Sequence, residues 1–165
     1  MSEWTLLCYK HSFSSGPKKE HTVSHQYDVM IQDHTCQFKG FSPNPNHQFD
    51  EEGFSILSVA DNFIDELTIV EEKVDVTRVL DVKKQGFGPL VGATLVYGPH
   101  KVIFYIAKQV FGAFYPGEPN LSFEKNYSSQ MEPDVVFVQV LPSYYFSGVF
   151  ILCSDGSVMC VQTLS

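Results

Sequence analysis

Arginine is almost missing from this sequence, because Arg78 is the only one among 165 residues. Nucleic-acid and phosphate binders present basic patches and favour the forked guanidinium group for their contacts. Here 19 acidic residues outnumber 11 basic ones, and the net charge is −8. We therefore expect no nucleic-acid partner.

Alanine is also scarce, with four residues, and alanine is the best helix former. Valine, in contrast, occurs 19 times and phenylalanine 14 times. Branched and aromatic side chains suit the pleated, half-buried surface of a β-sheet. This imbalance predicts strands before any periodicity is considered.

Long hydrophobic runs are absent as well. The residues after Met1 show neither the basic region nor the apolar region of a secretory signal. The most apolar stretch, residues 87–115, is interrupted by prolines and by charged side chains, so it does not resemble a transmembrane helix. We expect a soluble protein without a membrane partner.

The cysteine spacing does not match a small disulfide scaffold. The four cysteines are Cys8, Cys36, Cys153 and Cys160. We predict a two-residue hairpin turn at Asp155-Gly156, in which Cys153 faces Val158 and Cys160 faces Ile151. The last two sulfurs are then out of register for a bridge. The sequence predicts free thiols and a reducing, cytoplasmic location.

Short runs with a period of two residues, separated by turn-forming residues, cover most of the chain. The clearest pair is the hairpin of residues 148–153 and 158–164, and a second hairpin joins residues 90–97 and 101–107. Other expected strands are residues 4–9, 27–31, 35–41, 54–59, 109–115 and 134–141. Residues 116–133 carry three prolines and are expected to form a long loop.

Residues 61–82 fit two patterns. Apolar residues recur with helical spacing from Phe63 onward, and a short helix at residues 61–67 would have Asp61 as its N-cap. Branched residues and alternation favour two strands instead, at residues 66–71 and 73–82. We prefer the strands. The whole sequence, residues 1–165, is then a single all-β domain, an antiparallel β-barrel or β-sandwich of about nine or ten short strands.

The sequence contains no recognisable catalytic, metal or cofactor motif. His21 and His25 stand four apart, but the residues between them form helices poorly, so both are expected in a loop. A metal site from His34, Cys36 and Cys8 has the right chemistry, but buried, inert thiols are the commoner arrangement. We expect no catalytic residue, no metal and no cofactor.

The acidic excess is confined to one segment. Residues 50–81 contain ten acids against Lys73 and Arg78, so this segment carries the whole net charge of the chain. Such a segment, beside apolar positions, predicts a docking surface for a protein with a basic surface. Our leading hypothesis is therefore a non-enzymatic protein–protein interaction module. The expected binding residues are Asp61, Phe63, Asp65, Glu66, Glu71 and Glu72.

Two other classes of function stay open. A closed barrel of this length can carry a small apolar ligand, and its expected lining is Phe104, Tyr105, Phe111 and Phe137. A small His-dependent enzyme on a β scaffold would use a histidine, which titrates near neutral pH. The best candidate site for it combines His100 with Cys153 or Asp134.

Overall fold

The described part of the chain consists almost entirely of antiparallel β-strands. The computed structural model describes residues 2–11, 21–31, 38–43, 54–70, 73–82, 86–97, 100–143 and 145–163. These residues contain 13 strands and a short 3₁₀ turn, but no α-helix. The expected all-β class is thus confirmed.

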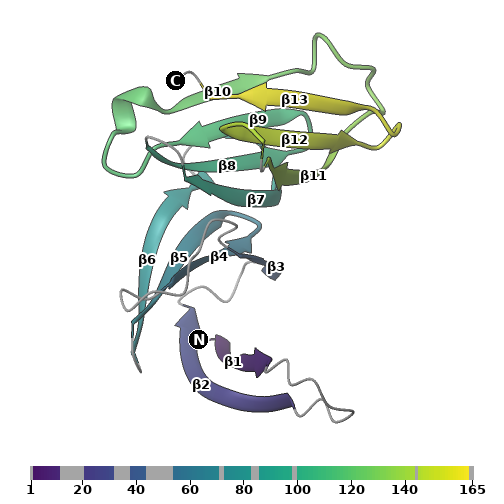
Figure 1. Cartoon of the computed structure of the whole chain (residues 1–165). Helices are drawn as coiled ribbons and strands as arrows, with labels where there is room; N and C mark the ends of the chain where they lie inside the picture. Colours follow the sequence, from purple (N-terminus) through teal and green to yellow (C-terminus); the bar gives the residue numbers. More distant parts are fainter. Residues whose placement is uncertain are drawn as a thin grey trace.

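The described strands form three open sheets and one hairpin (Figure 1). The N-terminal sheet has the order β3-β4-β5-β6, with β3 (Phe38–Pro43), β4 (Phe54–Ala60), β5 (Phe63–Val70) and β6 (Lys73–Asp81). The central sheet has the order β10-β9-β8-β7, with β7 (Leu90–Tyr97), β8 (Lys101–Ala107), β9 (Val110–Phe114) and β10 (Phe123–Asn126). The C-terminal sheet has the order β11-β12-β13, with β11 (Phe137–Pro142), β12 (Gly148–Cys153) and β13 (Val158–Gln162).

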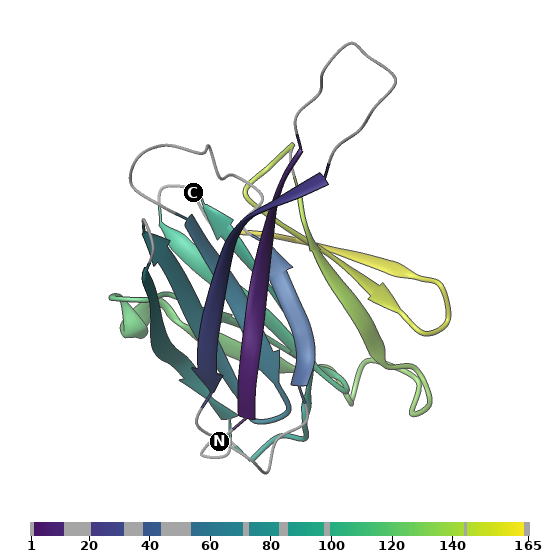
Figure 2. The same ribbon diagram turned by 90° about the horizontal axis from the view of Figure 1, so that it is seen from below.

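The remaining two strands form a separate hairpin. β1 (Ser2–His11) pairs with β2 (His21–Ile31). Seen from below, this hairpin lies across the N-terminal sheet (Figure 2). That sheet is therefore covered on one face by the hairpin and on the other face by the central sheet.

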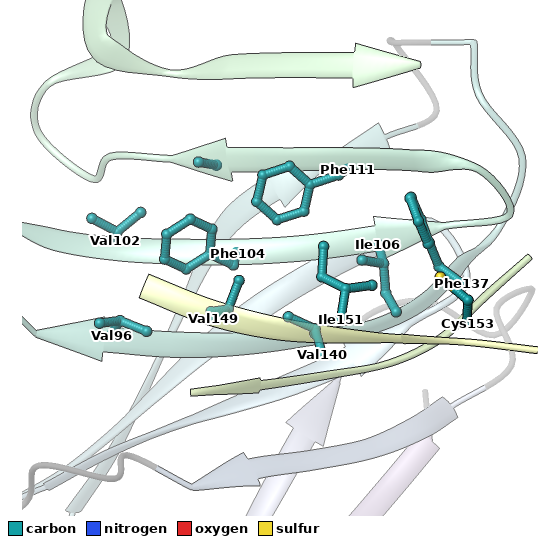
Figure 3. Packing of buried hydrophobic residues seen from close by; sticks show 11 residues of the cluster. Val96, Val102, Phe104, Ile106, Phe111, Phe137, Val140, Val149, Ile151 and Cys153 are labelled. Carbon is teal, nitrogen blue, oxygen red and sulfur yellow. The ribbon is translucent and has the colours of Figure 1, made fainter. Parts of the chain in front are cut away.

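The inner strands β8 and β9 of the central sheet are buried on both faces, which explains the unbroken apolar sequence of β8. Phe104 and Ile106 point toward the C-terminal sheet, whereas Ile103 and Tyr105 point toward the N-terminal sheet. Figure 3 shows Phe104 and Phe111 of the central sheet packed beside Val149 and Ile151 of β12. We call this packed region the C-terminal core. A second region, the N-terminal core, lies between the N-terminal and central sheets.

Gly112 lies under an aromatic ring of the neighbouring strand. It pairs with Tyr105 and with Glu124 in an unshifted register. A Cβ atom at position 112 would lie 2.0 Å from Cζ of Tyr105. The Tyr105 hydroxyl continues across the strand and donates a hydrogen bond to Glu124 at 3.2 Å. Burial, together with this carboxylate, raises the pKa of Tyr105.

Replacing Gly112 with alanine should therefore destabilise the protein. The added methyl group has to displace the Tyr105 ring, and overpacking of this kind costs about 1–3 kcal/mol. Gly92 supplies a matched control in the same sheet, because a Cβ atom there would meet its nearest neighbours at 4.0 Å. Urea unfolding should show a lower free energy of unfolding for Gly112→Ala than for the wild type, and little change for Gly92→Ala. Equal effects would mean that the ring does not constrain position 112.

The turn between β12 and β13 is one residue longer than expected. The Gly156 N–H donates to the Cys153 carbonyl at 3.0 Å, and the Cys153 N–H donates to Ser157 O at 2.9 Å. Gly156 has a φ of 86°, as the last position of a three-residue hairpin loop requires. The expected register is consequently wrong by one residue, and Cys160 faces Phe150. Both cysteines of this hairpin are nevertheless free, as expected.

The remaining expectations concern residues 61–82 and residues 116–133. Residues 63–70 form strand β5, so the preferred strand interpretation is confirmed over the helix. The expected loop at residues 116–133 contains a 3₁₀ turn (Pro119–Leu121) and strand β10. The described strands form open sheets rather than a closed barrel.

Candidate functional site

The acidic segment contributes strand β5, and two of its carboxylates are neutralised within the molecule. Asp65 pairs with Arg78 of β6 in the strand register, and the guanidinium group donates to both of its carboxylate oxygens. The same guanidinium group lies over the Phe63 ring, 3.7 Å from its centre. Arg78 thus interacts through its charge with two residues of its own sheet, in an ion pair and a cation–π contact.

Glu66 is the second neutralised acid. Its Oε1 atom accepts a hydrogen bond from Nζ of Lys101, at the start of β8. The carboxylate is almost fully buried, whereas the lysine is partly exposed. Because Lys101 belongs to the central sheet, this ion pair joins two sheets at the edge of the N-terminal core.

The expected exposure of this segment is wrong for three of its residues. Phe63, Asp65 and Glu66 are buried, and Asp61 is half-buried. The physical reason is that β5 is an inner strand of a sheet covered on both faces, so even its polar positions have little contact with water. Glu71 and Glu72 lie outside the described residues. A binding role for the segment stays a prediction.

Burial raises the pKa of Asp65, and this effect exceeds the opposite effect of Arg78. The folded protein therefore holds this proton more tightly than the unfolded chain, whose ordinary pKa is 3.8. It follows that the stabilising effect of protonation is present below pH 3.8 and is lost as the pH rises through the raised pKa.

The Asp65→Asn variant isolates this effect, because asparagine does not titrate and all other carboxylates are shared. Urea unfolding from about pH 3 to pH 7 should show that the wild type loses free energy of unfolding, relative to the variant, as the pH rises. If the wild type instead gained free energy of unfolding relative to the variant as the pH rises, the effect of Arg78 would exceed that of burial and the pKa of Asp65 would be lowered.

The residues of the expected enzyme site have separate environments. His100 is exposed, and its Nδ1 lies 2.9 Å from Oε1 of Glu118. Cys153 is buried in the C-terminal core, beside Phe137 (Figure 3). Asp134 is exposed. Among the described residues, no three acidic, histidine or cysteine side chains gather to form a metal site. The alternative metal site of His34, Cys36 and Cys8, which the sequence made less favoured than inert thiols, involves side chains that the structure does not describe.

The four aromatic residues expected to line a ligand cavity do not share one interior. Phe104, Phe111 and Phe137 belong to the C-terminal core, whereas Tyr105 belongs to the N-terminal core on the opposite face of the central sheet. The rings of Phe104 and Phe111 stack with their centres 5.6 Å apart. These side chains therefore belong to two separate hydrophobic cores.

The outer face of the C-terminal sheet is apolar and partly open to solvent. Inward residues of β12, such as Ile151, fill the C-terminal core, so alternate residues point away from it. Cross-strand pairing places Leu141, Phe150 and Cys160 in one row across the three strands. Gln139, Leu152 and Val158 form the next row. Gln139 is the only amide among these six residues, which we call the outer apolar face.

Exposure of this face is substantial at its two edges. Leu141 on β11 keeps 45% of its surface exposed and Val158 on β13 keeps 60%. Phe150 is half-buried, and the ring of Phe146 packs against it edge-on at 5.3 Å. Tyr145, in the loop before β12, is 95% exposed. Several large apolar groups of one sheet are therefore available to a partner.

The sequence carries a signal for this face that the reading of the acidic segment missed. Residues 135–165 contain one charged side chain, Asp155, which lies in the hairpin turn. There it accepts hydrogen bonds from the Ser157 N–H and hydroxyl groups, which lower the pKa of Asp155. The lack of charge in this region is as unusual as the acidic excess of residues 50–81. Depletion of charge is the feature that marks the centre of protein interfaces.

The sequence matches no known protein-family model and no curated protein. In the part of the chain described here, no helix has the length and apolar character needed to cross a bilayer.

Proposed function

We propose that this protein is a protein–protein interaction module and that the outer apolar face is its contact surface. The observation that carries the proposal is the uncharged row of Leu141, Phe150 and Cys160 on an open sheet face. Interface centres combine aromatic and aliphatic groups with few charges, and this face has that composition.

The acidic segment has a different part in this proposal. Asp65 and Glu66 are occupied by Arg78 and Lys101, so they are poor anchors for a partner. The net charge of −8 would still accelerate the approach of a partner with a basic surface. Contact through the outer apolar face and long-range attraction by the acidic residues are thus separable properties.

A charge placed on the face tests the proposal. We expect Leu141→Glu to weaken partner binding at least tenfold, about 1.4 kcal/mol, because a carboxylate would have to be buried in an apolar contact. Val76→Glu is a matched control, since Val76 on β6 is exposed to a similar extent, 41%, on another sheet. Each variant is compared with the wild type by photo-crosslinking in cells from a probe at Phe150.

The expected result is that Leu141→Glu abolishes the crosslinks and Val76→Glu preserves them. Circular dichroism of both purified variants confirms that each remains folded. Crosslinks that survive Leu141→Glu but disappear in Val76→Glu would move the contact to the N-terminal sheet and contradict the proposal.

A further inference from the structure

Among the strands that the structure describes, β13 has an unpaired backbone edge. The Thr163 N–H donates to Ser147 O at 2.8 Å, and Ser157 O accepts from Cys153, so the odd-numbered residues here bond to the β12 side. Consecutive residues in an antiparallel ladder direct their backbone groups to opposite sides. Val158, Cys160 and Gln162 therefore direct their N–H and C=O groups away from β12, where no described strand pairs with them.

Proteins usually protect such an edge with charges, prolines or bulges. The other edge strands of the three sheets follow this rule, within the described ranges. β6 and β10 carry charged residues, β3 and β11 contain proline and a register shift, and β7 has a register shift. β13 has the sequence VMCVQ and pairs with β12 without a shift, so it has none of these protections.

We propose that a second copy of this chain pairs with β13 in antiparallel orientation, across a two-fold axis near Cys160. This inference goes beyond the proposed function, because the second copy contacts the β13 edge of the same sheet and leaves its outer apolar face free. An axis at Cys160 aligns Val158 with Gln162 of the second copy and joins the outward backbone groups of both strands. The result is one continuous six-stranded sheet with a continuous outer apolar face.

Charge favours a second copy at this position over other positions. Two molecules with a net charge of −8 repel each other, and the repulsion is strongest where acidic residues meet. The C-terminal sheet has its only charge, Asp155, in the turn beyond the strand ends. Two copies can therefore approach closely through β13 without placing like charges in the contact.

The test is sedimentation equilibrium of the full chain over a wide range of concentrations. We expect a dimer that strengthens when salt is added, because salt screens repulsion between the acidic copies. Binding to a basic partner would weaken with salt. Cys160→Pro removes an N–H that faces the open edge, and no bond to β12, so the strand should remain folded. We expect it to raise the dimer dissociation constant at least tenfold, about 1.4 kcal/mol.

A second variant covers the case in which proline disturbs the strand. Cys160→Lys keeps the N–H but places two like charges at the axis, and it should also weaken the dimer. Val76→Lys is its control on β6 and should leave the dimer intact. A dimer whose dissociation constant is unchanged in both Cys160→Pro and Cys160→Lys contradicts the inference. An assembly larger than a dimer contradicts it as well.

A chain that stays monomeric also overturns the second-copy inference. The proposed function then survives if Leu141→Glu still abolishes crosslinks to another protein from the Phe150 probe. If Leu141→Glu has no effect on those crosslinks either, both proposals fail.

Discussion

Replacing Phe104 with alanine is expected to lower the free energy of unfolding by about 3–5 kcal/mol. Phe104 is fully buried in the C-terminal core and stacks on Phe111. Its truncation leaves a cavity in the C-terminal core, between the central and C-terminal sheets (Figure 3). This core supports the sheet that carries the outer apolar face. Urea unfolding monitored by circular dichroism measures the loss.

Phe123→Ala is the matched control for this prediction. Phe123 on β10 also contacts the Phe111 ring, at 5.8 Å, but 46% of its surface is exposed. The same chemical change should therefore cost about 1 kcal/mol or less. Similar losses for both variants would show that Phe104 is not the packing centre that its burial indicates.

Replacing Lys101 with methionine should lower the free energy of unfolding by about 3 kcal/mol, the lower end of the range for a broken buried ion pair. Methionine retains the apolar stem of the lysine but leaves the Glu66 carboxylate buried without its partner. The lower end applies because the lysine is 28% exposed, so some water reaches the pair. Chemical denaturation at neutral pH measures the change.

The double variant Glu66→Met with Lys101→Met provides the control. It removes both charges, and apolar replacement of a buried pair is often neutral or stabilising. We expect it to regain most of the stability lost in the single variant. A double variant as unstable as Lys101→Met alone would show that the loss comes from packing of the lysine and not from the unpaired carboxylate.

The sequence was sufficient to predict strands because alternation is a local property. The hairpin of β12 and β13 followed from Asp155-Gly156, although the longer loop shifted its register by one residue. Strand β10 could not be predicted, since its four residues, Phe123–Asn126, are all exposed and carry no apolar alternation. It exists because β9 offers an edge for pairing, which is a tertiary property.

The candidate site was harder to predict than the fold. Charge density in residues 50–81 indicated an exposed surface, but Asp65 and Glu66 lie on an inner strand, where bases from two other strands neutralise them. A single sequence contains no record of which acid meets which base. The outer apolar face became visible only when pairing placed Leu141, Phe150 and Cys160 in one row.

Backbone amide exchange in β13, resolved by NMR on the full chain, tests the central claim most directly. At low concentration the amides of Met159 and Val161, which face β12, should be protected, whereas those of Val158, Cys160 and Gln162 should exchange rapidly. At high concentration the second group should become protected as well. Rapid exchange of these three amides at every concentration, with new protection on β6 or β10 instead, would contradict the account.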